Sequence, residues 1–95
     1  MAYIRIAQPP NVTADTYEKV NAQLEAMGAQ PPAGMLVHAA GEVDGKWQIV
    51  DVWESEQQAR QFYEGPLTEA IEAVIGMTPP DAPHTAYELH TLVRS

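Results

Sequence analysis

Asp44 and Gly45 separate two segments of alternating, strand-forming residues, Met35–Ala40 and Lys46–Glu54. Both central residues of a type I′ turn need positive φ, and the Asp-Gly dipeptide adopts that conformation readily. The sequence therefore predicts a β-hairpin with a two-residue turn. In such a hairpin the numbers of two facing residues add up to 89, as those of Asp44 and Gly45 do.

The segments on either side of the hairpin predict two helices and two further strands. Thr13 is a suitable N-cap for the first helix, and Ser55 with Gln58 forms a capping box that begins the second. Gly65-Pro66 interrupts the second helix, where the proline suits the first position of a new helical segment. In chain order we expect a strand over 3–8, a helix over 13–28, the hairpin, a helix over 55–76 and a strand over 85–93.

This order of elements predicts an α+β domain, with one domain over residues 1–95. The arrangement β-α-β-β-α-β is the ferredoxin-like one, in which a four-stranded antiparallel sheet carries its helices on one face. The hairpin strands have apolar residues on both faces, for example Val37 and Ala39 on one and Leu36 and Ala40 on the other. Because an apolar sheet face without helices needs a cover, we expect a homodimer.

The charge of the chain argues against two classes of partner. Thirteen acidic and five basic residues give a formal net charge of −8. Nucleic acids and anionic membranes are met by clusters of Lys and Arg, so neither is expected as a partner. The sequence has no apolar run long enough for a membrane span and begins without a secretory signal pattern, so a cytoplasmic location is expected. It also has no cysteine, which excludes thiolate chemistry.

The run from Gly41 to Phe62, GEVDGKWQIVDVWESEQQARQF, together with His38, resembles the dimeric α/β-barrel superfamily. Within it the similarity is to the antibiotic biosynthesis monooxygenase-like group, and its most specific part is Trp53-Glu54-Ser55 followed by a helix with an aromatic residue at Phe62. The resemblance implies two ferredoxin-like sheets packed face to face, with a small-molecule pocket between sheet and helices in each subunit. Its members include cofactor-free oxygenases, isomerases, haem-degrading enzymes and proteins of no assigned activity.

The hairpin register predicts a polar pair with catalytic potential. His38 is expected opposite Asp51, on a face that otherwise carries Leu36, Ala40, Trp47, Ile49 and Trp53. A carboxylate beside the ring fixes the tautomer and raises the histidine pKa, whereas burial lowers it, so His38 is a candidate general base and Asp51 its orienting partner. The alternative is a buried hydrogen-bonded pair with no reaction attached. A slip of one residue would place the two side chains on opposite faces.

Six further residues are candidates for substrate contact. Trp53, Phe62 and Tyr63 could stack on an aromatic substrate. Tyr17 could close the pocket from the first helix, and Leu36 is expected opposite Trp53. Arg5 could hold a ligand oxyanion or pair with Asp51. For each of these residues an ordinary core or surface role is the alternative.

No metal or cofactor is expected. His38, His84 and His90 have no i, i+4 spacing, and there is no Gly-rich phosphate loop. Haem-degrading relatives have an axial histidine late in the second helix, whereas residues 69–75 contain none. The functional hypothesis is a cofactor-independent monooxygenase or isomerase for a small aromatic or polyketide-like substrate. A non-catalytic ligand-binding or assembly domain is the alternative.

Overall fold

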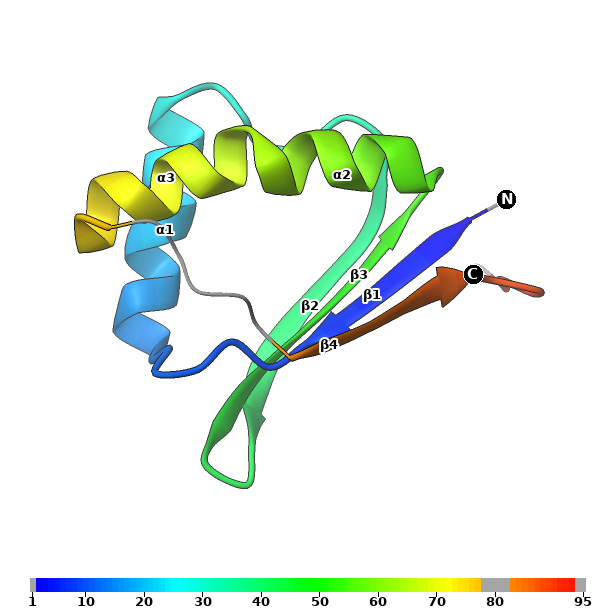
Figure 1. Ribbon diagram of the computed structural model, residues 1–95, viewed down its shortest axis with the longest axis horizontal. Helices are drawn as coiled ribbons and strands as arrows, with labels where there is room; N and C mark the ends of the chain where they lie inside the picture. Colours follow the sequence, from blue (N-terminus) through cyan, green and yellow to red (C-terminus); the bar gives the residue numbers. More distant parts are fainter. Residues whose placement is uncertain (1, 78–82, 94–95) are drawn as a thin grey trace.

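The computed structural model describes residues 2–77 and 83–93 and has the ferredoxin-like order β-α-β-β-α-β (Figure 1). The second helical segment is divided in two at Gly65. The elements are β1 (Tyr3–Ala7), α1 (Ala14–Ala26), β2 (Met35–Val43), β3 (Lys46–Trp53), α2 (Glu56–Glu64), α3 (Pro66–Ile75) and β4 (His84–Glu88).

The four strands form one antiparallel sheet in the order β2-β3-β1-β4. Figure 1 shows all three helices on one side of this sheet and none of the described chain on the other. Side chains alternate between the two faces along each strand, so β3 directs Asp51 and Trp53 towards the helices and Val50 and Val52 away from them. The predicted fold class is confirmed.

Local sequence signals explain where the helices and the hairpin turn lie. Thr13 Oγ1 accepts a hydrogen bond from the Thr16 amide at 3.3 Å, and Ser55 Oγ accepts one from the Gln58 amide at 3.2 Å. In the turn between β2 and β3, Asp44 has φ of 51° and its neighbour Gly45 has φ of 77°. The two-residue turn is therefore the one that the sequence predicted.

The core lies between the sheet and the helices. Its buried members are Leu24 from α1, Trp53 from β3, Ala59 and Phe62 from α2, and Ala70 from α3. Trp53 is completely buried, and its ring packs against Phe62 with 5.5 Å between centroids. The end of β3 is thus fixed under α2, next to the position of Asp51.

Two predicted strand details are wrong. The last strand was expected to run to Val93, but β4 ends at Glu88, opposite Tyr3, the first residue of β1, and one backbone hydrogen bond from Leu89 to Ala2 follows it. The expected pairing of Leu36 with Trp53 does not form either. A β-bulge at Leu36 leaves that residue unpaired and places Met35 opposite Trp53.

Candidate active site

Three of the predicted site residues lie side by side on three neighbouring strands, on the helix-facing side of the sheet. His38 of β2 lies opposite Asp51 of β3, and Asp51 lies opposite Arg5 of β1. The predicted register of the hairpin is confirmed here, because the bulge at Leu36 comes before His38 and leaves the pairing nearer the turn unchanged.

Asp51 is a buried carboxylate with a donor on each oxygen. Its residue exposure is 3%, whereas the His38 side chain is 36% exposed. His38 Nδ1 lies 2.5 Å from Asp51 Oδ1, and the Tyr63 hydroxyl donates to Asp51 Oδ2 at 2.7 Å. A buried charge is tolerated when its hydrogen bonds are satisfied, and both carboxylate oxygens meet that condition.

Hydrogen bonds extend from both ends of this pair. Trp53 Nε1 donates to the Tyr63 hydroxyl at 2.9 Å, so the Tyr63 proton is directed to Asp51. On the other side, the hydroxyl of Tyr17 from α1 contacts His38 Nε2. The five residues Tyr17, His38, Asp51, Tyr63 and Trp53 therefore form one continuous hydrogen-bond chain.

The ionised carboxylate of Asp51 sets the tautomer of His38. Because a carboxylate only accepts hydrogen bonds, Nδ1 of His38 carries a proton, and Nε2 of the neutral ring is an acceptor. The Tyr17 hydroxyl is then the donor to Nε2. In this tautomer His38 can accept a proton at Nε2, the nitrogen that faces away from Asp51.

Two side chains in the hydrogen-bond chain have shifted acidities. The hydrogen bond to Asp51 raises the pKa of His38 above its usual value, against the opposing effect of partial burial. Burial, followed by the negative charge of Asp51, raises the pKa of Tyr63 far above its usual value. Tyr63 therefore stays protonated and remains a hydrogen-bond donor at any ordinary pH.

Two aromatic contacts restrain the two tyrosines of the hydrogen-bond chain. The guanidinium carbon of Arg5 lies 4.4 Å from the centroid of the Tyr63 ring, a cation–π arrangement. Within the described chain Arg5 makes this contact and no ion pair with Asp51. Trp47 of β3 packs on the Tyr17 ring with 5.1 Å between centroids.

Comparisons with known proteins place the fold. No protein-family model matches the sequence, and no curated protein matches it significantly. Among solved structures, a provisionally assigned antibiotic biosynthesis monooxygenase from Chloroflexus aurantiacus J-10-fl superposes with a TM-score of 0.66 at 16% identity, covering 99% of this chain and 98% of the other. The chain has the ferredoxin-like fold of the antibiotic biosynthesis monooxygenase-like proteins.

Two further matches share this antibiotic biosynthesis monooxygenase-like fold. A dimeric ferredoxin-like protein of unknown function from Thermobifida fusca has a TM-score of 0.59 at 23% identity, over 94% of this chain and 92% of the other. SnoaB from Streptomyces nogalater, described as a cofactor-independent oxygenase, has a TM-score of 0.56 at 15% identity, over 99% and 96%. At these identities the likeness establishes the fold alone.

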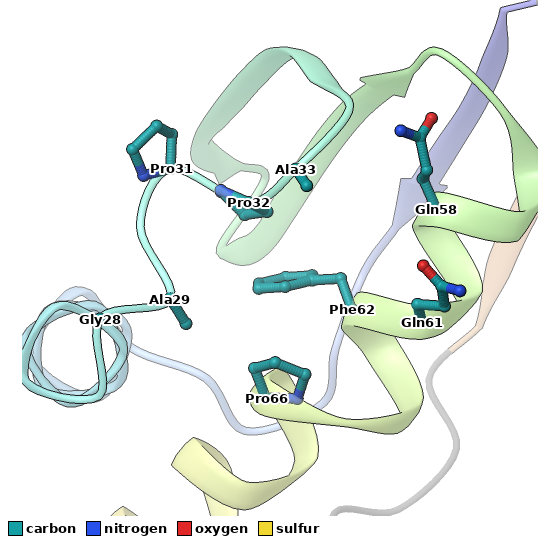
Figure 2. Close-up of a pocket in the computed structure, with 9 residues that line it drawn as sticks. All are labelled: Gly28, Ala29, Pro31, Pro32, Ala33, Gln58, Gln61, Phe62 and Pro66. Atoms are coloured by element: carbon teal, nitrogen blue, oxygen red, sulfur yellow. The ribbon is translucent and has the colours of Figure 1, made fainter.

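The remaining predicted contact residues are more scattered. Phe62 lines a cavity of about 410 Å³ between α2, the start of α3 and the loop that precedes β2 (Figure 2). Trp53 lies behind Phe62 and is closed off from solvent. His38 and Asp51 line neither this cavity nor a second one of about 350 Å³ near Gln8. A substrate pocket around His38 therefore remains a prediction.

Sequence reasoning missed the hydroxyl of Tyr63 as a partner of Asp51. The sequence marks Tyr63 as an aromatic residue of the second helix, but its contact depends on how α2 is rotated over the sheet. The sequence also did not predict the state of Trp47, whose Nε1 is buried without a hydrogen-bond partner in the described part of the chain. No pattern in a single sequence would have identified the Tyr63 hydrogen bond or the unpaired Trp47 nitrogen.

The described residues hold neither a metal site nor a membrane-spanning helix. Over residues 2–77 and 83–93, no group of three or more His, Asp or Glu side chains is placed to hold a metal ion. In the same ranges, no helix combines the length and apolar character needed to cross a membrane.

Proposed function

We propose that this protein is a cofactor-independent monooxygenase that acts on a small aromatic or polyketide-like molecule, with His38 as its general base and Asp51 as the residue that orients it. The observation that carries the proposal is the buried Asp51 carboxylate, which is held by Tyr63 on one oxygen and directs Nδ1–H of His38 with the other. The description of SnoaB as a cofactor-independent oxygenase on the same fold supports this chemistry.

The first step is removal of a proton from the substrate. A histidine with a raised pKa is a stronger base than a free imidazole, and the adjacent carboxylate stabilises the imidazolium that forms. Asp51 keeps its charge throughout, because its role is to hold the ring and balance the new positive charge. An isomerase that returns the proton to another substrate atom would need only this step.

In the oxygenase the substrate anion then reacts with dioxygen. The anion is electron-rich and transfers electrons to dioxygen, which forms a C–O bond and a peroxide anion. The imidazolium returns a proton, and loss of water leaves a carbonyl. Overall a CH₂ group and O₂ give C=O and H₂O, so the substrate is oxidised and dioxygen reduced without a further electron donor.

We include a homodimer in the proposal because of the helix-free face of the sheet. Val37, Val43 and Tyr87 on this face are 42%, 45% and 49% exposed. Apolar side chains gathered on one uncovered face favour association. A second copy would cover this face, and the Thermobifida fusca protein of the same fold is described as dimeric.

Oxygen uptake on a panel of anthrones, quinols and lactones tests the oxygenase. We expect turnover by the wild type and a decrease of at least about a hundredfold in kcat/KM for His38→Gln, since general bases contribute that much or more. His90→Gln is the matched control, because His90 is exposed and lies outside β4. Full turnover by His38→Gln, with both variants folded by circular dichroism, would exclude His38 as the base.

A non-catalytic ligand-binding protein is the second candidate. The cavity lined by Phe62 favours it, because its volume is in the range of small-molecule sites and none of its lining residues is charged. Binding of an aromatic ligand that is lost in Phe62→Ala, is kept in His38→Gln and proceeds without turnover would support this function over the oxygenase.

A further inference from the structure

Nε2, the nitrogen of His38 that would act as the base, already has a hydrogen-bond partner. Nδ1 is directed to Asp51, so Nε2 is the atom that would accept a substrate proton, and the Tyr17 hydroxyl contacts it directly. A substrate cannot reach Nε2 unless Tyr17 moves away. The outermost atom of the hydrogen-bond chain is therefore the Tyr17 oxygen.

The arrangement of the two rings favours proton transfer between them. The planes of Tyr17 and His38 differ by 2°, with 5.9 Å between centroids. Since the hydroxyl also contacts Nε2, the rings are almost coplanar and meet edge to edge, which places the hydroxyl along the lone pair of the nitrogen. Trp47 packs against the Tyr17 ring and restrains it in this orientation.

We propose that the Tyr17 oxygen, and not His38 itself, exchanges the proton with the substrate. This inference rests on the proposed function, in which His38 is the base. As the substrate O–H bond breaks, its proton forms a new O–H bond to Tyr17, while the original Tyr17 proton forms an N–H bond to Nε2 of His38. The negative charge moves to the substrate, and the imidazolium is paired with Asp51.

This relay selects a class of substrate. Proton exchange through a tyrosine is most efficient with an acid whose pKa is close to that of a phenol, about 10. A phenolic or enolic hydroxyl meets this condition, whereas a carboxylic acid is already ionised at neutral pH. The formal net charge of −8 also disfavours an anionic substrate. The substrate is thus an uncharged molecule with a phenolic or enolic hydroxyl.

A chromogenic phenol tests the relay without turnover. We expect wild-type protein saturated with 4-nitrophenol, at a pH about one unit below the pKa of the free phenol, to show the phenolate absorption band. Tyr17→Phe should reduce this band to that of the free phenol at the same pH, of which about one tenth is ionised. Tyr3→Phe is the matched control, because Tyr3 lies on the same face of the sheet, outside the hydrogen-bond chain.

The outcomes separate the relay from the proposed function. A wild-type phenolate band in Tyr17→Phe would show that His38 acts directly and would overturn the relay alone. A band that depends on Tyr17, without oxygen uptake on any substrate, would support the relay and reject the oxygenase. No band in the wild type would count against both. If Tyr17→Phe does not fold, difluorotyrosine at position 17 should shift the pH dependence of the band to lower pH, and an unchanged dependence would overturn the relay.

Discussion

Asp51 is the residue on which the candidate site depends most. A carboxylate that is 3% exposed is stable only with hydrogen-bond donors on its oxygens, and here these are His38 and Tyr63. Each donor comes from a different element, so loss of either would disturb both the site and the packing of β2 or α2 on β3. The same contacts allow the pair to be tested by stability as well as by activity.

The stability of the protein should depend on pH through His38. Its pKa is raised on folding, so the stabilisation from the charged pair is complete below the usual value of 6.5 and is lost as the pH rises through the raised value. We therefore expect the difference in unfolding free energy between wild type and His38→Gln to shrink as the pH rises. Urea unfolding from acid to alkaline pH measures this difference, and a constant value would show that folding does not raise the pKa of His38.

Tyr63→Phe should destabilise the protein although it removes a single oxygen atom. Asp51 Oδ2 would lose its donor and Trp53 Nε1 its acceptor, and an unsatisfied buried group costs about 1 to 3 kcal/mol. Thermal unfolding should show the change as a lower Tm. Tyr3→Phe removes the same atom from a tyrosine of β1 and should leave the Tm nearly unchanged. Equal Tm values for the two variants would mean that Tyr63 contributes little to holding Asp51.

Among the elements, the β2–β3 hairpin controls the site most directly. Its turn at Asp44 and Gly45 fixes which residues face each other, and a slip of one position would move His38 to the other face of the sheet. The order of the elements and the His38–Asp51 pairing could be predicted because turn, cap and periodicity are local properties of the sequence.

Other features of the elements depend on contacts that local patterns do not encode. The bulge at Leu36 places Met35, which packs against the core, opposite Trp53. The end of β4 depends on where β1 begins, and the Tyr63 contact depends on the rotation of α2. For this reason the sequence predicted His38 and Asp51 as a pair, whereas it did not predict Tyr63, which donates to the second oxygen of Asp51.

Gly45→Ala should weaken the hairpin. An alanine at φ of 77° costs roughly 1 to 2 kcal/mol, and beyond the two neighbouring residues no atom lies within 4 Å of the position that its Cβ would take, so the effect is one of backbone conformation. Chemical denaturation measures this loss. Asp44→Asn is the control in the same turn, because asparagine tolerates positive φ and should be nearly neutral. An unchanged stability for Gly45→Ala would argue that this turn does not fix the register.

For the whole molecule, the two faces of the sheet have different environments. The helices cover the face with Asp51 and Trp53, while the face with Val37 and Val50 is left without a helix (Figure 1). The hydrogen-bond chain is complete within one protomer. Association through the helix-free face would therefore stabilise the sheet without adding any residue to the hydrogen-bond chain.

Val37→Lys tests the proposed dimer. Val37 is 42% exposed on the helix-free face, and burial of an unpaired charge there should raise the dimer Kd by at least about tenfold. Ile75→Lys is the control, because Ile75 is 41% exposed at the end of α3, in the helical layer. Sedimentation measures the dimer Kd of both variants. Dimers of equal affinity in the two variants, or a monomeric wild type, would reject this interface.

The bulge at Leu36 gives β2 one position where its length can change. Leu36 is the extra residue between the pairs Met35–Trp53 and Val37–Val52, so its removal would leave a regular ladder with Met35 still opposite Trp53 and His38 still opposite Asp51. Deletion of Ala39 would instead move every residue of β2 that precedes it to the opposite face of the sheet. Homologous chains that differ by one residue in this strand should therefore have their gap at position 36.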